Sequence, residues 1–425
     1  GVLNNSGDGL IYSQQGDVGL QAASLNNAKG TVQAKGAITV QATGLLDNQG
    51  GKLIAQDGAL TVTADTLDNR GGILASLKQA LGVRTTGVLR NGSDATGQRG
   101  ILQALSLDVQ SASLDNHGGR IAALGGDTAI RTGQLDNRDG GISASGLLKV
   151  TGASLLNGGD ARGEMVGQRI ELGLSGALDN RGGIIESAST LAITAATLDN
   201  QGGQLRAVGT SGKSQFAIGG LFDNRNGQVE IGNSDLTLGA GLLQNVGGKV
   251  LHVGKGVFDI DTANLTRAGG SLSTRGGLTL TADSWTNGSA IQAGRLTVNV
   301  NNLTQTAGGQ LLAFDSLVGN GGNWSNEGLI ASDGALSLNL GGTYSSANGR
   351  VNSLGTLGVS AAQMNLGSNA SITGVGNTTI NVAGLLTNQG RLSSAGDLLV
   401  NAGSVNNLGT LGGNQLVRVT TGSLR

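Results

Sequence analysis

Residues 66–75 read TLDNRGGILA, and the core of this phrase recurs along the chain. Variants of it stand at 46–53 (LDNQGGKL), 135–142 (LDNRDGGI), 178–185 (LDNRGGII) and 198–205 (LDNQGGQL). A catalytic motif is normally written once, whereas the structural element of a repeat protein is written once in every repeat. The recurrence therefore predicts a structural role for the phrase.

The composition of the 425 residues is unusual, because 78 are Gly, none is Pro or Cys, and aromatic residues make up only 2%. The lack of Cys excludes disulfides, thiolate zinc sites and cysteine nucleophiles. A net charge of −1 gives no electrostatic basis for binding nucleic acid, and no apolar run is long enough for this segment to insert in a membrane. Because residues 2–7 (VLNNSG) already belong to a repeat, we expect the sequence to be a fragment of a longer chain.

The phrase defines a repeat of about 21 residues, which is a spacing typical of solenoids. Its first apolar residue occurs 20 times, from Leu3 to Val405, and Asn follows two positions later in 16 repeats. We expect a single continuous array over 1–425, with regular coils over 1–264 that contain insertions at 92–100 and 158–164. Coils over 265–425 are expected to be more divergent. The four repeats without this Asn carry Arg267, Gln305, Ser346 and Leu366.

Short runs between the phrases alternate apolar and polar residues, as in AITVQA (37–42), ALTVTA (59–64) and LTVNV (296–300). This period of two indicates β-strands. Strands that repeat every 21 residues must stack on their own copies, about 4.8 Å apart. The sequence therefore predicts an all-β fold, a parallel β-helix of about 20 coils.

Within the phrase, we expect Leu67 to point inward and the Gly pair to form a tight turn. The next apolar residue, Ile73 in this coil and Leu53 in another, is expected to start the next face, with Ala75 and Ala55 in the interior. The corner Asn is expected to bond its counterparts in neighbouring coils. The predicted structural corner residues are Asn48, Asn69, Asn116, Asn137, Asn180, Asn200 and Asn224.

The Asp of the phrase has two interpretations. Carboxylates stacked about 5 Å apart could bind cations. The interpretation we favour is that they face outward, form turns with the local backbone and pair with neighbouring arginines, as Asp68 would with Arg70.

The LDNxGG phrase followed by (I/L)xA, in coils of about 21 residues, resembles the haemagglutinin repeats of two-partner-secreted exoproteins. These proteins include filamentous haemagglutinins and contact-dependent growth inhibition proteins. The resemblance spans essentially the whole chain; it is strong from Leu46 to Leu243 and looser after Leu265.

This resemblance implies a right-handed β-helix in a secreted protein of the bacterial cell surface. It further implies export in unfolded form through an outer-membrane transporter partner. The implied function is a stalk that displays a binding region or a toxin away from the producing cell, with an adhesive role. A receptor on a target or host cell would be bound through other segments.

Two loops interrupt the corner rule and are the candidate surface-binding segments. They are GSDATGQRG (92–100) and GGDARGE (158–164), which share an Asp-Ala-x-Gly sequence and lie three coils apart at the same corner. Insertions in solenoids often form a binding face, although long loops are also tolerated without one. The candidate binding residues are Asp94, Arg99, Asp160 and Arg162.

A third candidate is AVGTSGKS (207–214), a loose form of a phosphate-binding loop. The following residues, QFAIGG (215–220), indicate a strand and a turn, whereas phosphate binding needs a helix there. A longer coil is the interpretation we prefer.

Two charged or titratable residues fall at the interior position of a strand, His252 and Glu186. An interior His or Glu is costly unless it is paired. For Glu186 we expect a local shift that turns the side chain outward, and we expect His117 to be exposed.

The alternative to a stalk is a β-helical carbohydrate-active enzyme or a tailspike-like glycan binder. Glycoside hydrolysis needs a pair of carboxylates in a groove, and the five Glu of this chain are scattered. We therefore predict no catalytic residues, no cofactor and no metal site.

Overall fold

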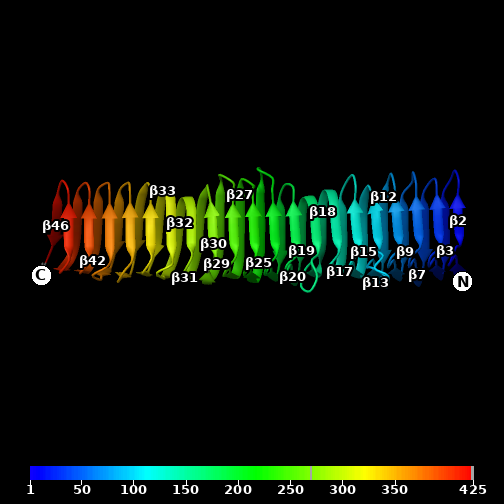
Figure 1. Ribbon diagram of the computed structural model, residues 1–425, viewed down its shortest axis with the longest axis horizontal. Helices are drawn as coiled ribbons and strands as arrows, with labels where there is room; N and C mark the ends of the chain where they lie inside the picture. The colour runs from blue at the N-terminus through cyan, green and yellow to red at the C-terminus, as the bar shows by residue number, and fades with distance from the viewer. Residues whose placement is uncertain (269, 423–425) are drawn as a thin grey trace. The chain divides into compact units, whose positions relative to one another are not determined.

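The computed structural model describes residues 1–268 and 270–422, and every regular element among them is a β-strand (Figure 1). The strands form parallel pairs with their counterparts one repeat away, which is the arrangement of a β-solenoid of about 20 turns. The predicted all-β, parallel stacked fold is thus confirmed. The chain divides into two compact units, residues 1–209 with 214–219 and residues 210–213 with 220–425. The predicted boundary at residue 265 remains a prediction.

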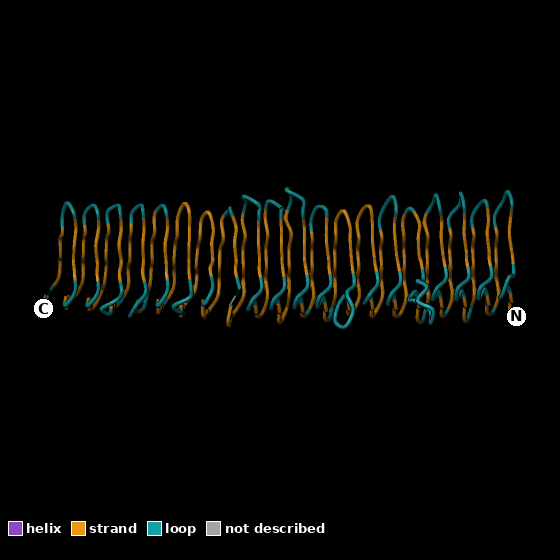
Figure 2. The backbone as a smooth tube through the Cα atoms, in the orientation of Figure 1, coloured by secondary structure: helices purple, strands orange, loops and turns teal. Residues whose placement is uncertain are grey.

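One coil of the first unit shows how the sequence builds the fold. The corner strand β10 (Thr66–Asp68) is followed by a turn, a second strand β11 (Ile73–Ser76), another turn and a third strand β12 (Ala80–Thr85). Leu67 pairs in register with Leu46 of the coil before and Leu89 of the coil after. Teal turns separate the orange strands at regular intervals along the trace (Figure 2).

In the first unit, some strands cover one face of a coil and others run through a bend into the next face. The corner strands are β1 (Val2–Asn4), β4 (Ser24–Asn26), β7 (Leu45–Asp47), β10, β13 (Val88–Arg90), β20 (Ala177–Asp179) and β23 (Thr197–Asp199). The second strands are β2 (Leu10–Ser13), β5 (Thr31–Ala34), β8 (Lys52–Ala55), β11, β14 (Ile101–Ala104), β16 (Arg120–Ala123), β21 (Ile184–Ser187) and β24 (Gln204–Ala207). The third strands are β3 (Val18–Ala22), β6 (Ile38–Ala42), β9 (Leu60–Ala64), β12 and β22 (Leu191–Ala195). The continuous strands are β15 (Ser106–Asp115), β17 (Thr128–Asp136), β18 (Gly141–Leu156) and β19 (Glu164–Leu174), and β25 (Lys213–Asp223) has residues in both units.

The second unit repeats the same coil with more strands that continue through a bend. Its strands up to residue 326 are β26 (Gln228–Ile231), β27 (Asp235–Gln244), β28 (Lys249–His252), β29 (Val257–Ala268), β30 (Ser271–Thr274), β31 (Gly277–Asn287), β32 (Ala290–Gln305), β33 (Gln310–Gly321) and β34 (Asn323–Asn326). The remaining strands are β35 (Leu329–Ser332), β36 (Ala335–Leu340), β37 (Thr343–Ser346), β38 (Arg350–Ser353), β39 (Leu357–Ala361), β40 (Gln363–Leu366), β41 (Ser371–Gly374), β42 (Thr378–Asn388), β43 (Arg391–Ser394), β44 (Leu398–Asn407), β45 (Thr410–Gly413) and β46 (Val417–Thr421).

The narrow interior is filled by aliphatic side chains in most coils and by buried aromatic side chains in others, namely Phe216, Phe222, Phe258, Trp285, Trp324 and Tyr344. Leu67, Leu74, Leu81 and Val83 are fully buried, and each stacks on an equivalent residue of the neighbouring coils. Burying a Leu or Val side chain stabilises a fold by roughly 1.5–3 kcal/mol. Few aromatic residues are needed because each coil encloses only one layer of side chains on each face.

The register of the second strand differs from the one expected for the coil that begins at Leu67. Ile73 pairs with Lys52 on the outer surface and is only half-buried, whereas Leu74 pairs with Leu53 in the interior. Ser76, not Ala75, takes the interior position of Ala55. β11 begins at Ile73, as expected, and Ala75 is buried, but the expectation that Ala75 shares the interior position of Ala55 was wrong, because Leu74 and Ser76 take the interior positions.

The two glycines of the phrase have different functions. The first has a positive φ, for example +67° at Gly182, a conformation that Lys29, Asp139 and Asn226 adopt in other coils. The second is required for space, because a Cβ on Gly183 would lie 2.3 Å from the carbonyl oxygen of Asn157. Asn tolerates the left-handed region, but no side chain tolerates contact with backbone at that distance.

We expect Gly183→Ala to lower the free energy of unfolding by about 2–3 kcal/mol, since the added methyl group forces two coils apart. Gly182→Asn should cost less than about 1 kcal/mol, because its Cβ meets open space and Asn accepts a positive φ. Thermal unfolding followed by circular dichroism compares the two variants. Equal melting temperatures would contradict the claim that the first glycine serves the backbone angle and the second serves the close packing of coils.

Candidate functional site

A ladder of buried side-chain amides runs from coil to coil through the first unit. In each coil the Asn Nδ2 atom donates a hydrogen bond to the Asn Oδ1 atom of the next, at 2.6–2.8 Å. The side chains from Asn27 onward are fully buried. The ladder contains the predicted residues Asn48, Asn69, Asn116, Asn137, Asn180 and Asn200, together with Asn5, Asn27, Asn91 and Asn157.

Each rung of the ladder also holds the turn beside it. Asn69 Nδ2 donates to the carbonyl oxygens of Gly72 in its own coil, at 3.2 Å, and of Ile101 in the next, at 3.3 Å. The same amide thus fixes the turn of its own coil and the start of the second strand in the following coil. Buried amides satisfied in this way stabilise a fold, whereas a buried unpaired amide costs about 1–3 kcal/mol.

In the second unit the ladder continues with substitutions. Asn224 donates to Asn245 at 2.7 Å, and Asn388 donates to Asn407 at 2.7 Å. Gln305, which breaks the sequence pattern, still accepts from Asn287 at 3.1 Å and donates to Asn326 at 3.0 Å. Asn326 then donates to the Tyr344 hydroxyl at 3.2 Å. Complete burial raises the pKa of Tyr344 to about 12, so it remains a neutral phenol.

Two of the other exceptions are also accounted for. The Ser346 hydroxyl accepts from the backbone N–H of Gly349 at 3.0 Å, and Leu366 is buried as an apolar replacement. Arg267 carries a side chain that lies outside the described part of the chain.

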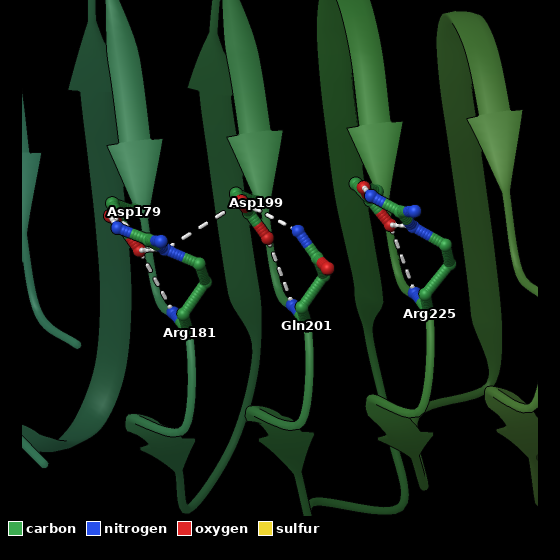
Figure 3. A network of polar contacts seen from close by, with 6 residues as sticks. Asp179, Arg181, Asp199, Gln201 and Arg225 are labelled. Atoms are coloured by element: carbon green, nitrogen blue, oxygen red, sulfur yellow. Dashed lines mark hydrogen bonds and ion pairs between the residues drawn. The ribbon is translucent and has the colours of Figure 1, made fainter. Parts of the chain in front are cut away.

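The carboxylates of the phrase face outward and bond within their own turn. Arg181 donates its backbone N–H to Asp179 Oδ1 at 3.0 Å and its guanidinium Nη2 to Oδ2 at 2.6 Å, and Gln201 does the same for Asp199 with its amide (Figure 3). Partial burial raises the pKa of Asp179, but the hydrogen bonds from Arg181 outweigh this effect, so the pKa lies below its ordinary value. In the second unit Arg225 and Asp223 repeat the pair at 2.5 Å. These bonds agree with the turn-and-arginine interpretation that we favoured.

The insertion at 92–100 is a self-contained loop on an intact ladder. Asp94 Oδ1 accepts from the backbone N–H groups of Thr96 and Gln98 and from the Thr96 hydroxyl, at 2.7–2.9 Å. The hydroxyl bond, followed by the backbone bonds, lowers the pKa of Asp94. Gln98 Nε2 ties the loop to the Gly71 carbonyl oxygen at 2.7 Å, and an antiparallel bridge joins Ser93 to Arg99. Asp94 therefore holds the loop, and Arg99 is exposed beside it.

The insertion at 158–164 leaves its candidate residues exposed. Asp160 and Arg162 are both exposed, and the Asp160 carboxylate acts electrostatically on Arg138 and Arg181 in the neighbouring turns. The ladder again continues at its base, where Asn157 bonds Asn180 at 2.8 Å. The binding role of both loops remains a prediction.

An open groove of about 380 Å³ lies beside the second strands of the coils between the two loops. Arg99 from the first loop and Arg120 at the start of β16 lie at one end, and Glu164 at the start of β19 lies at the other. Gly141, at the start of β18, is in register with both Arg120 and Glu164. Sequence reasoning found Arg99 but missed the other three, because their alignment depends on the strand register.

The AVGTSGKS segment does not have the geometry of a phosphate loop. Residues 204–207 are the strand β24, and β25 begins at Lys213, so no helix follows the loop. Ser214 is fully buried, and its hydroxyl accepts the backbone N–H of Leu191 at 2.9 Å. The preferred interpretation as a longer coil agrees with these strands.

The two residues predicted at interior positions have different outcomes. Glu186 points outward, as expected, and pairs with Arg206 at 2.6 Å, but no local shift is needed, because Ile184–Ser187 pairs in unbroken register with both neighbouring coils. His252 lies in the interior, fully buried, with Nδ1 2.9 Å from the Thr274 hydroxyl and Nε2 2.9 Å from the Asn233 carbonyl oxygen. Because a carbonyl can only accept, Nε2 carries the proton of a neutral imidazole, and burial lowers the pKa of His252.

Comparison with known proteins agrees with the repeating, stacked-coil fold of the structure. The sequence profile of the haemagglutinin repeat matches residues 3–57, 39–93, 55–105, 104–182, 166–226 and 331–425. The chain belongs to the haemagglutinin-repeat family. Its members are secreted exoproteins of the cell surface, and this chain has their stalk architecture.

This haemagglutinin-repeat chain is also similar to Deoxyribonuclease CdiA of Dickeya dadantii (strain 3937). The two are 28% identical over 92% of this chain, which spans only 12% of the length of that relative. No solved structure matches the chain significantly. Among the described residues, no helix is long and apolar enough to cross a membrane.

We expect Asn180→Ala to lower the free energy of unfolding by about 3 kcal/mol, since it removes the ladder bonds to Asn157 and Asn200 and those to the carbonyl oxygens of Gly183 and Gln204. Arg181→Ala, one position away, should cost less than about 1 kcal/mol because the Arg181 pair is exposed to solvent. Thermal melting of the two variants measures the difference. An Asn180→Ala protein as stable as the Arg181→Ala protein would show that the ladder does not hold the coils together.

The stability around His252 should depend on pH. Its pKa is lower in the folded chain than the ordinary value of 6.5, so the unfolded chain takes up a proton first as the pH falls. The folded state is therefore fully favoured above pH 6.5 and loses stability as the pH drops below it. Hydrogen exchange of β28 between pH 7 and pH 5 measures this loss. His252→Gln should reduce the pH dependence, whereas His117→Gln, at the exposed histidine, should leave it unchanged.

Proposed function

We propose that this segment is a spacer within a longer exoprotein, displaying a binding region or a toxin at a distance from the producing cell. The observation that supports this most directly is the amide ladder from Asn5 to Asn200, which links every coil of the first unit to the next. Each coil depends on its neighbours alone, so coils can be added without altering the others. Such a design suits a stalk whose length is its function.

We infer that the chain crosses the outer membrane unfolded, through a transporter partner, and folds as it emerges. The composition supports this, because the chain has no Pro and no Cys. Neither proline isomerisation nor disulfide formation, which are two slow steps in the folding of many proteins, can then delay the coils. Each new coil can use the edge of the preceding one as its template.

We propose that the segment itself catalyses no reaction. The name of the relative from Dickeya dadantii assigns a deoxyribonuclease activity to that protein, of which this chain spans only 12%. The carboxylates of the phrase, such as Asp179, are engaged by their own arginine and backbone. Receptor binding and any toxin activity are assigned by this proposal to other segments, and adhesion by this segment is a further part of the proposal.

A deletion of one complete coil tests the spacer function in the full-length protein on producing bacteria. Removing residues 178–197 joins Ala177 to Leu198, which is the register that the neighbouring coils already use. We expect surface display and contact with target cells to be retained, because Asn157 can then bond Asn200. Removal of residues 178–187 alone should abolish display, because it breaks the register.

Surface labelling and a target-cell contact assay are the two measurements for this pair. A whole-coil deletion that remains displayed but loses all contact activity would contradict the proposal. That result would mean that the coil contains an active site and is more than a spacer.

A further inference from the structure

The groove between the two insertion loops has unpaired charges, in contrast to the charged turns around it. Arg70, Arg138 and Arg181 each form an ion pair with the Asp of their own turn. Arg99 and Arg120 form no ion pair with any described residue, and the same holds for Glu164 within residues 1–268 and 270–422. All three side chains are exposed to solvent.

Register explains why Arg120 and Glu164 do not neutralise each other. Arg120, Gly141 and Glu164 occupy the same outward position in three successive coils. Their backbones are therefore about 10 Å apart across two coil spacings, with a residue that has no side chain between them. The groove is thus an open slot with a positive end and a negative end, and its volume of about 380 Å³ falls in the range of small-ligand sites.

We propose that this groove binds an oligosaccharide that carries a carboxylate, through Arg99 and Arg120. A guanidinium binds a carboxylate with two parallel hydrogen bonds, and two guanidiniums at one end of the slot favour one such group strongly. Glu164 accepts hydrogen bonds from sugar hydroxyls at the other end, and Ser143 offers a hydroxyl between them. Val166, 37% exposed, gives the C–H face of a sugar ring an apolar contact.

The surroundings of the groove favour a sugar over an acidic peptide. A peptide that binds as an added strand needs a free strand edge, and a helical peptide needs an apolar groove. Here the strand β16 is paired with β14 on one side and β18 on the other, and β18 is paired in turn with β19. No strand edge is therefore available in this part of the first unit. This site concerns the segment itself and does not depend on what the stalk displays.

Gly141 provides a way to close the slot without disturbing the fold. A Cβ on Gly141 has no heavy atom within 4 Å, and its φ is not in the left-handed region. Ile occupies the equivalent position in other coils as Ile73, Ile101 and Ile184. Gly141→Ile therefore places a side chain that the coil already accepts into the centre of the groove.

The test measures the binding of defined probes to the whole 425-residue chain by isothermal titration calorimetry. The probes are an oligogalacturonate and its methyl ester, sialyllactose and lactose, and a short poly-glutamate peptide. We expect at least one acidic sugar to bind more tightly than its neutral partner, with an affinity that falls as salt is raised. Arg120→Gln and Arg99→Gln should each weaken this binding about tenfold or more, and Gly141→Ile should abolish it.

Two control variants separate the groove from general effects. Arg84→Gln removes another exposed positive charge, on β12, and Gly82→Ile adds the same side chain at another glycine whose Cβ has open space. Both controls should bind the acidic sugar as the wild type does, and all five variants should melt at temperatures similar to that of the wild type.

Three results would overturn the proposal. One is the absence of any preference for the acidic sugar over its neutral partner. Another is binding that Gly141→Ile and Arg120→Gln weaken no more than the controls do. The third is binding of the poly-glutamate peptide alone, which would assign the groove to a protein partner.

Discussion

The hydrogen bond between the corner Asn side chains of successive coils is the interaction on which the rest of the structure depends. Asn69 bonds the amides on either side of it and the carbonyl that begins the next second strand. Because side-chain direction alternates along a strand, a slip of one residue would turn every Leu outward and every polar residue inward. The buried amide of Asn69, which bonds both its counterparts and the backbone beside it, fixes the register in which Leu67 meets Leu46 and Leu89.

The sequence predicted the parts of the fold that repeat. The positions of Leu67 and Asn69 followed from their recurrence, and the outward direction of Glu186 followed from the cost of burying a charge. The sequence could not predict the outward position of Ile73, because an apolar residue after the Gly pair suits both faces. In LDNRDGGI the residue that turns is Asp139, so Gly141 falls in the outward column and leaves the groove open. The missing side chain at this outward position follows from the strand register, which composition and repeat spacing do not predict.

The insertions show how this fold accommodates extra residues without breaking the amide ladder. Asn91 and Asn157, at the bases of the two loops, keep their ladder bonds at 2.8 Å. The loops leave the corner after the Asn and return before the next strand, so the coil beneath them is unchanged. Variation is therefore confined to the outer surface, where Arg99 and Arg120 lie, and the stalk remains intact.

Hydrogen exchange of the corner Asn side-chain amides tests the central claim most directly. With 15N-labelled Asn, the Nδ2 protons of Asn48, Asn116 and Asn180 can be compared with those of the exposed Asn4. If the ladder holds the coils together, the buried amides should exchange as slowly as the backbone amides of the neighbouring strands. Exchange at the rate of Asn4 would show that the ladder bonds open freely, and the register would then have to be fixed by apolar stacking alone.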